Sequence, residues 1–293
     1  MENHGLVAKQ RLTEAEIAEI KHLTTLCNNY ENLHTRPSFD MIRNRSGQQT
    51  DDFLYYDVGA IVGYLFVDSY GFDEKELILM VHPDYRRKGI GRTLLNAAQI
   101  EGKRRGLKRL ILICEDYAPS GQAFVQAVGA ELDFAEHEMV LGTFRERGTV
   151  DERLTFRRAK NSDMDMLIAI LATDSENEER AREYMKEWFH YPKQSFYLAT
   201  FTEKSLGSLE PVGMIRLDEM EQDMAIYGFV VVPEYRGRGY GRQILEETIR
   251  TIRSVSQKRI TLEVDTTNTI AMNLYLSVGF DVETTYNYYA LNL

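Results

Sequence analysis

The sequence contains little cysteine, no long apolar run and no excess of positive charge. It has only two cysteines, Cys27 and Cys114, which are too few for a disulfide framework or a cysteine metal cluster. No apolar run approaches the roughly 20 residues that a membrane-spanning helix needs. The N-terminal segment lacks the apolar core of a secretory signal. These absences predict a cytoplasmic protein without a membrane partner.

The formal net charge is −10 at pH 7, whereas a non-specific nucleic-acid binder needs an extensive basic face. We therefore expect no nucleic-acid partner. A negative charge attracts cationic small molecules over long range, although it equally favours simple solubility. No metal site is expected, because the histidines show none of the spacings of zinc-binding motifs: His4, His22, His34, His82, His137 and His190.

The chain contains an internal repeat at an offset of 150 residues. Residues 83–92 (PDYRRKGIGR) reappear as residues 233–242 (PEYRGRGYGR), and other elements keep this offset. Among them are Val62-Gly63 with Val212-Gly213, Lys108-Arg109 with Lys258-Arg259, and Gly129 with Gly279. A duplicated domain explains this register better than a chance motif. We expect an N-terminal domain over residues 1–142 and a C-terminal domain over residues 153–293, joined by a polar linker.

Hydrophobic patterning predicts a mixed α/β fold for the second copy. A nearly continuous apolar run at residues 227–232 indicates a strand buried on both faces. Residues 241–254 and 269–278 have the periodicity of helices. Further strands are expected at 154–158, 195–200, 212–217 and 260–264, and a final pair of strands at 280–291. Further helices are expected after 161 and at 178–189. The first copy repeats this order with a less regular opening.

In both copies the apolar strand runs into an Arg-x-x-Gly-x-Gly turn and then into an amphipathic helix. Glycines let successive backbone N–H groups converge into an anion-binding nest, and the helix adds its own N-terminal N–H groups. This arrangement suits a pyrophosphate. The alternative is a tight turn whose glycines serve geometry alone, and the matching context in two copies favours the anion site. The spacing differs from the G-x-G-x-x-G of dinucleotide-binding folds.

The turn resembles the acyl-CoA pyrophosphate loop of the GNAT acetyltransferase superfamily. A later segment, N-x-x-A-x-x-L-Y-x-x-x-G-F at residues 268–280, is also typical of that family. The second copy resembles the family from about residue 154 to its end, and the first mainly over residues 61–141. The resemblance implies two tandem domains, each with a mostly antiparallel central sheet flanked by helices. In each sheet a strand splays away from its neighbour and opens a wedge.

The resemblance also implies acetyl-CoA as the acyl donor and a primary amine of a small molecule or peptide as the acceptor. A backbone N–H near residues 229–231 is a candidate donor to the oxyanion. Residues implied to bind the cofactor in the second copy are Val231, Arg236, Gly237, Arg238, Gly239, Tyr240, Gly241 and Asn268. In the first copy they are Arg86, Arg87, Lys88, Gly89 and Gly91.

Tyr275 matches the position of the family's general acid. A phenol with an ordinary pKa near 10 is protonated at neutral pH and can supply a proton to the leaving thiolate. A buried core tyrosine is the alternative interpretation of Tyr275, and helix capping is the alternative for Asn268. We expect Glu263 to serve as the general base. Three further candidates for the base are Glu221, Asp223 and Tyr227.

The first copy departs from the family pattern where chemistry is expected. At the same offset Tyr275 corresponds to Val125, which has no proton to donate, and Asn268 corresponds to Ala118. We therefore predict that the C-terminal domain is catalytic and that the N-terminal domain is cofactor-binding or structural. The predicted function is an N-acetyltransferase, and the alternative is a non-catalytic acyl-CoA-binding regulator. The protein is expected to be a monomer or a homodimer.

Overall fold

The computed structural model describes residues 4–35, 37–68, 73–148, 151–175, 177–189, 191, 193–202 and 209–293. The chain forms two compact units. Unit 1 comprises Met1–Glu136 together with Thr284–Leu293, and unit 2 comprises His137–Glu283. The units therefore differ from the predicted domains 1–142 and 153–293 by two segments, one near the middle of the chain and one at its end.

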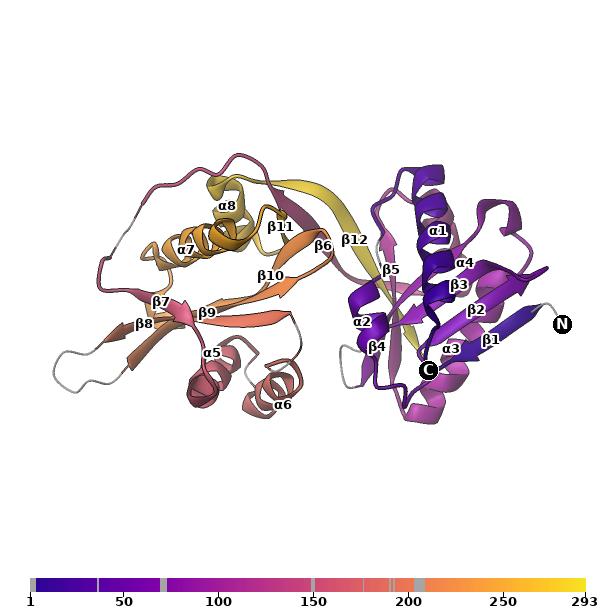
Figure 1. Cartoon of the computed structure of the whole chain (residues 1–293), viewed down its shortest axis with the longest axis horizontal. Helices are drawn as coiled ribbons and strands as arrows, with labels where there is room; N and C mark the ends of the chain where they lie inside the picture. Colours follow the sequence, from indigo (N-terminus) through magenta and orange to yellow (C-terminus); the bar gives the residue numbers. More distant parts are fainter. Residues whose placement is uncertain are drawn as a thin grey trace. The chain divides into compact units, whose positions relative to one another are not determined.

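Unit 1 is built on a mostly antiparallel sheet (Figure 1). Its strands are β1 (Gly5–Lys9), β2 (Asp52–Asp57), β3 (Ala60–Val67), β4 (Glu74–Val81) and β5 (Arg109–Glu115). They lie in this order, and only β4 and β5 pair in parallel. The end of β12 (Phe280–Asn292) then pairs antiparallel with β5, from Tyr286 opposite Glu115 to Asn292 opposite Arg109.

Helices cover both faces of this sheet. They are α1 (Glu14–Glu31), α2 (Phe39–Asn44), α3 (Ile90–Arg105) and α4 (Pro119–Val128). Helix α1 begins at a capping box in which the Thr13 hydroxyl accepts from the Glu16 amide and the Glu16 carboxylate reaches back to Thr13. It buries Ile20 against Tyr64 of β3, whereas α3 buries Leu94 against the opposite face.

Unit 2 repeats the arrangement (Figure 1). Its strands are β7 (Thr155–Arg158), β8 (Gln194–Thr202), β9 (Leu209–Glu219), β10 (Asp223–Val231) and β11 (Arg259–Asp265). Its helices are α5 (Met164–Ser175), α6 (Glu178–Trp188), α7 (Tyr240–Val255) and α8 (Thr269–Val278). Again only the fourth and fifth strands, β10 and β11, pair in parallel. The mixed α/β fold with a mostly antiparallel sheet is thus confirmed.

Each unit takes one strand segment from the other half of the chain. Strand β6 (Glu131–Leu141) lies next to β11, and its buried residues Met139 and Leu141 belong to the core of unit 2. The end of β12 does the reverse, because Tyr286 and Tyr288 pack on Ile111 of unit 1. The two repeats therefore exchange strands, which explains why the compact units differ from the predicted domains.

The polar linker that follows β6 packs on α7. Glu246 is fully buried, and its two carboxylate oxygens accept from the backbone N–H groups of Arg147 and Gly148, each at 3.1 Å. Gln243 exchanges hydrogen bonds with the backbone of Asp151. These buried polar contacts fix the linker along the helix that begins at the second nest.

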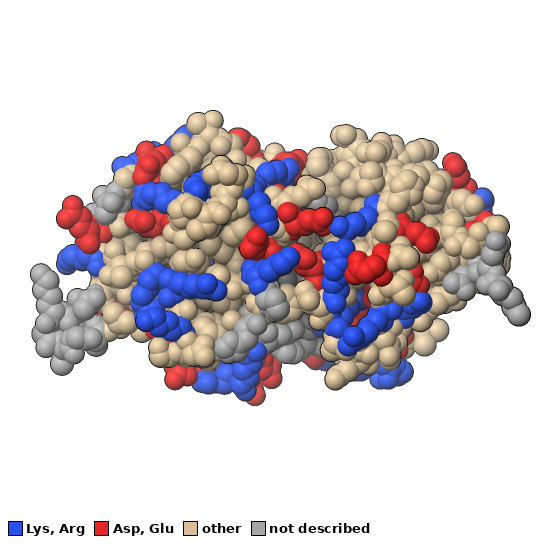
Figure 2. Space-filling model, viewed as in Figure 1, with Lys and Arg blue, Asp and Glu red and all other residues tan. Residues whose placement is uncertain are grey.

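Charged side chains of both signs are interspersed on the visible face of each unit (Figure 2). Many of them form local ion pairs. Arg105, for example, lies 2.7 Å from Asp51 and 2.8 Å from Glu101. Within the described part of the chain, no helix has both the length and the apolar character needed to cross a membrane.

Candidate active site

The parallel strands of unit 2 splay apart halfway along their length. Strands β10 and β11 pair from Asp223 opposite Arg259 to Ile226 opposite Leu262. Beyond that pair β10 continues to Val231 without β11 beside it. Unpaired backbone groups along such an edge can pair with an extended, amide-bearing chain. The wedge predicted for the second copy is therefore present at the predicted strand.

A β-bulge lies at the point where β10 leaves β11. Three steps along β10, from Tyr227 to Val230, oppose two steps along β9, from Arg216 to Met214. Gly228 within the bulge has a positive φ of 53°. A bulge removes backbone N–H groups from the ladder, so it leaves donors near residues 228–230 for another acceptor. This stretch overlaps residues 229–231, for which the sequence predicts an oxyanion donor.

Unit 1 has the splay without the bulge. Strands β4 and β5 pair from Glu74 to Leu77, and the pairing of β4 with β3 runs in register without a shift. Strand β4 has 8 residues, whereas β10 has 9. The extra residue of β10 is thus accommodated as the bulge.

The glycine-rich turn forms an open concave nest in both units. Gly237 and Gly239 have φ values of 72° and 88°, and α7 begins directly after them. In unit 1 the corresponding φ values are 63° at Arg87 and 83° at Gly89. A Cβ built on Gly237, Gly239 or Gly89 would meet no atom within 4 Å. This open space and the uncapped helix N-terminus fit a diphosphate group.

The basic side chains of the turns lie close to these nests. The Nε of Arg236 donates to the Val231 carbonyl at 2.8 Å, which ties the end of β10 to the turn. The guanidinium carbon of Arg238 lies 5.8 Å from the Tyr235 ring. In unit 1, the Nε of Arg86 donates to a strand-end carbonyl at 3.1 Å, and Lys88 lies over the Tyr85 ring.

The remaining motif residues, Gly241, Gly91 and Tyr240, serve packing. Gly241 lets α7 approach its neighbours, because its missing Cβ would lie 3.5 Å from Leu274 and 3.6 Å from Val231. Gly91 faces Phe124 of α4 in the same way, with 3.0 Å to the nearest ring carbon. Tyr240 is 9% exposed, and its side chain belongs to a hydrophobic cluster, so only its backbone can face the nest.

Tyr275 lies on α8 with 7% of its surface exposed. Burial raises its pKa to about 12, so the phenol is protonated at neutral pH. Its ring packs edge to face on Phe280, with the centroids 6.1 Å apart. Among the described residues the hydroxyl has no hydrogen-bond partner. The phenol therefore has the protonation state and the free O–H that a proton donor requires.

Two of the candidate bases lie at the opening of the wedge. Glu263 directly follows Leu262, the last paired residue of β11, and is half-buried. Tyr227 directly follows Ile226 on β10, and the pairing register places both side chains on the same face of the sheet. Asp223 lies at the other end of β10, where its carboxylate accepts from Arg259 Nε at 3.0 Å.

Asn268 is the N-cap of α8. Its Oδ1 accepts from the Ala271 amide at 3.1 Å. Helix capping, one of the two roles expected for this residue, is therefore observed. In unit 1 the N-cap of α4 is Ala118, which provides no side-chain cap.

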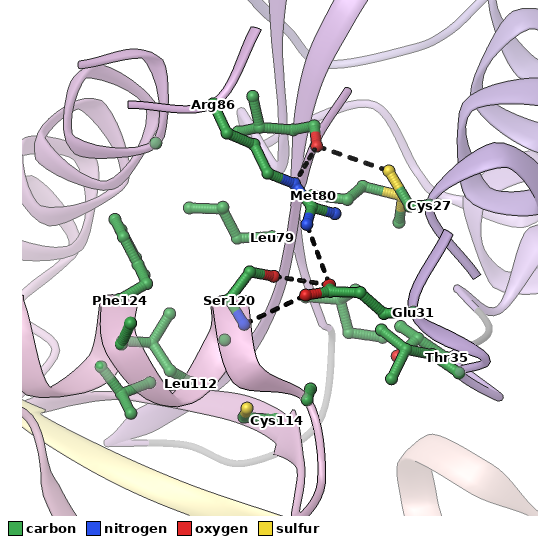
Figure 3. Close-up of a pocket in the computed structure, with 18 of the residues that line it drawn as sticks. Cys27, Glu31, Thr35, Leu79, Met80, Arg86, Leu112, Cys114, Ser120 and Phe124 are labelled. Atoms are coloured by element: carbon green, nitrogen blue, oxygen red, sulfur yellow. Dashed lines mark hydrogen bonds and ion pairs between the residues drawn. The ribbon is translucent and has the colours of Figure 1, made fainter. Parts of the chain in front are cut away.

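The wedge of unit 1 is apolar where that of unit 2 is polar. Ile78 and Ile113 follow its last strand pair, in the positions of Tyr227 and Glu263, and Val125 stands in the position of Tyr275. The wedge contains a cavity of about 400 Å³ (Figure 3). Its lining includes Leu79, Met80, Leu112, Cys114 and Phe124. The charged residues of the lining are Glu31, Arg86, Arg87, Arg92 and Glu115.

One polar cluster of unit 2 escaped the sequence analysis. Arg216 of β9 is 3% exposed, and its Nε lies 2.8 Å from Asp218 Oδ1. Its guanidinium lies over the rings of Tyr227 and Tyr184. Burial raises the pKa of Asp218 to about 6, even though Arg216 opposes the shift. The signal in the sequence was the pair of charged residues at alternate positions, 216 and 218, at the end of the apolar run that begins at residue 212.

Comparison with known families identifies the class of protein. The family model described as "Acetyltransferase (GNAT) family" matches residues 18–130 and 164–280. Because these matches cover most of both repeats, the chain belongs to the GNAT acetyltransferase family. The resemblance of both copies to that family is thereby confirmed.

Individual relatives agree with this assignment. A mycothiol acetyltransferase from Geodermatophilus obscurus is 27% identical over 247 residues, which cover 76% of each chain. The crystal structure of a GCN5-related N-acetyltransferase from Sphaerobacter thermophilus superimposes with a TM-score of 0.79 at 17% identity, covering 100% of this chain and 97% of that one. A tandem GNAT protein from the clavulanic acid biosynthesis pathway gives 0.69 at 16% identity over 98% of each chain. The two structures share the fold.

Proposed function

We propose that the protein transfers an acetyl group from acetyl-CoA to a primary amine of a small molecule or peptide, by direct attack in unit 2. The contrast between the two wedges carries this proposal. Unit 2 places Glu263 and Tyr227 at the strand opening and carries Tyr275 on α8, whereas unit 1 has Ile113, Ile78 and Val125 in the same positions. The nest beside the wedge, which both units retain, supports an acyl-CoA as the donor.

The nest of unit 2 is suited to the donor. Residues 236–241 would hold the diphosphate with backbone N–H groups and with the side chains of Arg236 and Arg238. The open edge of β10 would pair with the amides of the pantetheine chain. When bound, acetyl-CoA supplies the thioester and a thiolate leaving group.

The chain's own residues would then direct the transfer. A backbone N–H freed by the bulge beside Gly228 stabilises negative charge on the carbonyl oxygen. Glu263 accepts the proton that the attacking amine loses as the C–N bond forms. Tyr275 gives its proton to the sulfur as the C–S bond breaks, and it regains one from solvent.

The direct test is release of free CoA from acetyl-CoA in the presence of a panel of amines, including polyamines, amino acids, amino sugars and peptides. We expect turnover with at least one class. Val125→Ala changes the position in unit 1 that corresponds to Tyr275. It is the matched control for substitution of Tyr275 and should leave turnover unchanged. Absence of turnover with every amine, although acetyl-CoA binds, would contradict the proposal.

Titration calorimetry with acetyl-CoA assigns the donor site. Gly239→Trp blocks the nest of unit 2 and Gly89→Trp that of unit 1, with circular dichroism to confirm folding. We expect binding to vanish only in the Gly239 variant. Loss of binding only in the Gly89 variant would transfer the donor site to unit 1.

A non-catalytic acyl-CoA-binding role is the second candidate, and the absence of a proton donor in the unit 1 wedge, at the position of Tyr275, favours it. The cavity of about 400 Å³ adjoins a complete nest but lacks a proton donor at position 125. Cytoplasmic location and a monomeric or homodimeric state remain part of the proposal.

A further inference from the structure

Glu31 bridges the two sides of the unit 1 wedge (Figure 3). It is the last residue of α1, and its side chain is 9% exposed. Its carboxylate lies 3.0 Å from Arg86 Nη1, and it accepts from the amide and the hydroxyl of Ser120 at 3.1 and 2.6 Å. Arg86 follows β4 and Ser120 follows β5, so the carboxylate spans the gap at the splayed ends of these strands.

The bridge compensates for a missing helix cap. Ala118 at the N-cap of α4 provides no side-chain acceptor, whereas Asn268 caps α8 from within its own turn. Glu31 supplies the acceptor for α4 from 89 residues away in the sequence. A carboxylate at a helix N-terminus is stabilised by the unpaired N–H groups and the helix dipole. The cap that Glu31 provides for α4 therefore distinguishes unit 1 from unit 2, where Asn268 caps α8.

The same contact occupies groups that a CoA-type ligand would need. The nest over residues 86–91 has the left-handed turn and the open space of its counterpart in unit 2. Its first cation, Arg86, is already paired with Glu31, and the first turn of α4 is already capped. The negative charge of Glu31 also offsets the charge of Arg86, so this cation attracts a diphosphate less strongly.

We propose that Glu31 is a gate that keeps the wedge of unit 1 closed to CoA-type ligands, meaning a diphosphate joined to an extended amide-bearing chain. Removal of its carboxylate turns unit 1 into a second binding site. The inference rests on the proposed function only in taking CoA as the ligand. It concerns unit 1 instead of unit 2, and it involves binding without acetyl transfer.

The test is titration calorimetry with CoA itself, which cannot be turned over. The background variant is Gly239→Trp, with Gly237→Asp as a second way to block the nest of unit 2. Into this background we introduce Glu31→Ala together with Ala118→Ser, because a serine at the N-cap replaces the cap that Glu31 provided. The matched control carries Ala118→Ser without Glu31→Ala.

We expect one CoA site in the wild type, and at most residual binding in the background and the control. The Glu31→Ala/Ala118→Ser combination should recover one site, with an affinity at least about tenfold above that residual binding, corresponding to about 1.4 kcal/mol. Addition of Gly89→Trp should abolish it. This gain of binding separates a gate from a merely structural contact, whose loss would not create a site.

Two results would overturn the gate. One is a folded combination variant that does not bind CoA, and the other is background binding as tight as the combination's. If the wild type does not bind CoA but the combination does, the gate stands and the proposed donor site in unit 2 fails.

Discussion

Tyr227 of β10 lies directly opposite Arg216 of β9, and the guanidinium carbon of Arg216 is 4.9 Å from the centre of the tyrosine ring. The guanidinium also contacts the Tyr184 hydroxyl and lies 2.8 Å from the Asp218 carboxylate. Tyr227 is the first residue of β10 beyond its pairing with β11. A buried cation therefore fixes one side of the wedge opening in unit 2.

Arg216→Met should destabilise unit 2 strongly, by about 3–5 kcal/mol, because it leaves the buried Asp218 without its cation. Urea unfolding followed by circular dichroism measures the loss. The double variant Arg216→Met/Asp218→Leu removes both charges and should be clearly more stable than the single one. Equal stability of the two variants would show that the unpaired charge of Asp218 does not cause the loss of stability.

Asp218 should make stability depend on pH between 3.8 and about 6. Burial raises its pKa in the folded protein from 3.8 to about 6, so within this window the native state holds a proton that the unfolded state releases. Its contribution to the free energy of unfolding therefore falls as the pH rises through the window. We expect wild type to lose stability relative to Asp218→Asn over this range and no further above it. A relative gain with rising pH would mean that Arg216 outweighs desolvation.

Tyr275→Phe should lower kcat by about a hundredfold or more while acetyl-CoA binding is preserved, because only the proton donor is removed. The pKa of about 12 also predicts that kcat shows no loss attributable to this phenol up to pH 10. Steady-state kinetics over pH 7–10, with calorimetry for binding, checks both expectations. Unchanged kcat in the variant would remove Tyr275 from the role of acid.

Gly279→Ala should destabilise unit 2 by about 3 kcal/mol or more. Its φ is 111°, and an added Cβ would lie 1.9 Å from the Thr143 carbonyl oxygen of the linker. Gly129 is the matched control in unit 1, since its φ is 72° and a Cβ there meets nothing within 4 Å. Gly129→Ala should cost only about 1–2 kcal/mol, the price of a left-handed conformation. Similar thermal shifts for both variants would contradict the packing argument.

The repeat made much of the architecture predictable. The offset of 150 identified equivalent residues in both nests and in the helices α4 and α8. It also predicted that Tyr275 has no counterpart in the first copy. These features are local, because a glycine-rich turn between a strand and a helix carries its own conformational signature.

Long-range features were not predictable in the same way. The exchanged strand segments have ordinary strand sequences, and nothing in an alternating pattern tells which sheet a strand joins. The bulge at Gly228 arises from a single extra residue that an apolar run conceals. Glu31 escaped notice because it ends an irregular first segment, and its partner Ser120 is 89 residues away.

The exchanged strands set the order in which the protein can be completed during synthesis. Until residues 284–293 leave the ribosome, β5 has an unpaired edge where the end of β12 will lie. In this segment Asn287 is 171 residues away from its partner Asp116. An unpaired edge is prone to wrong pairing while it is exposed. The half of the chain that is made first therefore finishes folding last, and a polypeptide ending at residue 142 would be an incomplete domain rather than a small stable one.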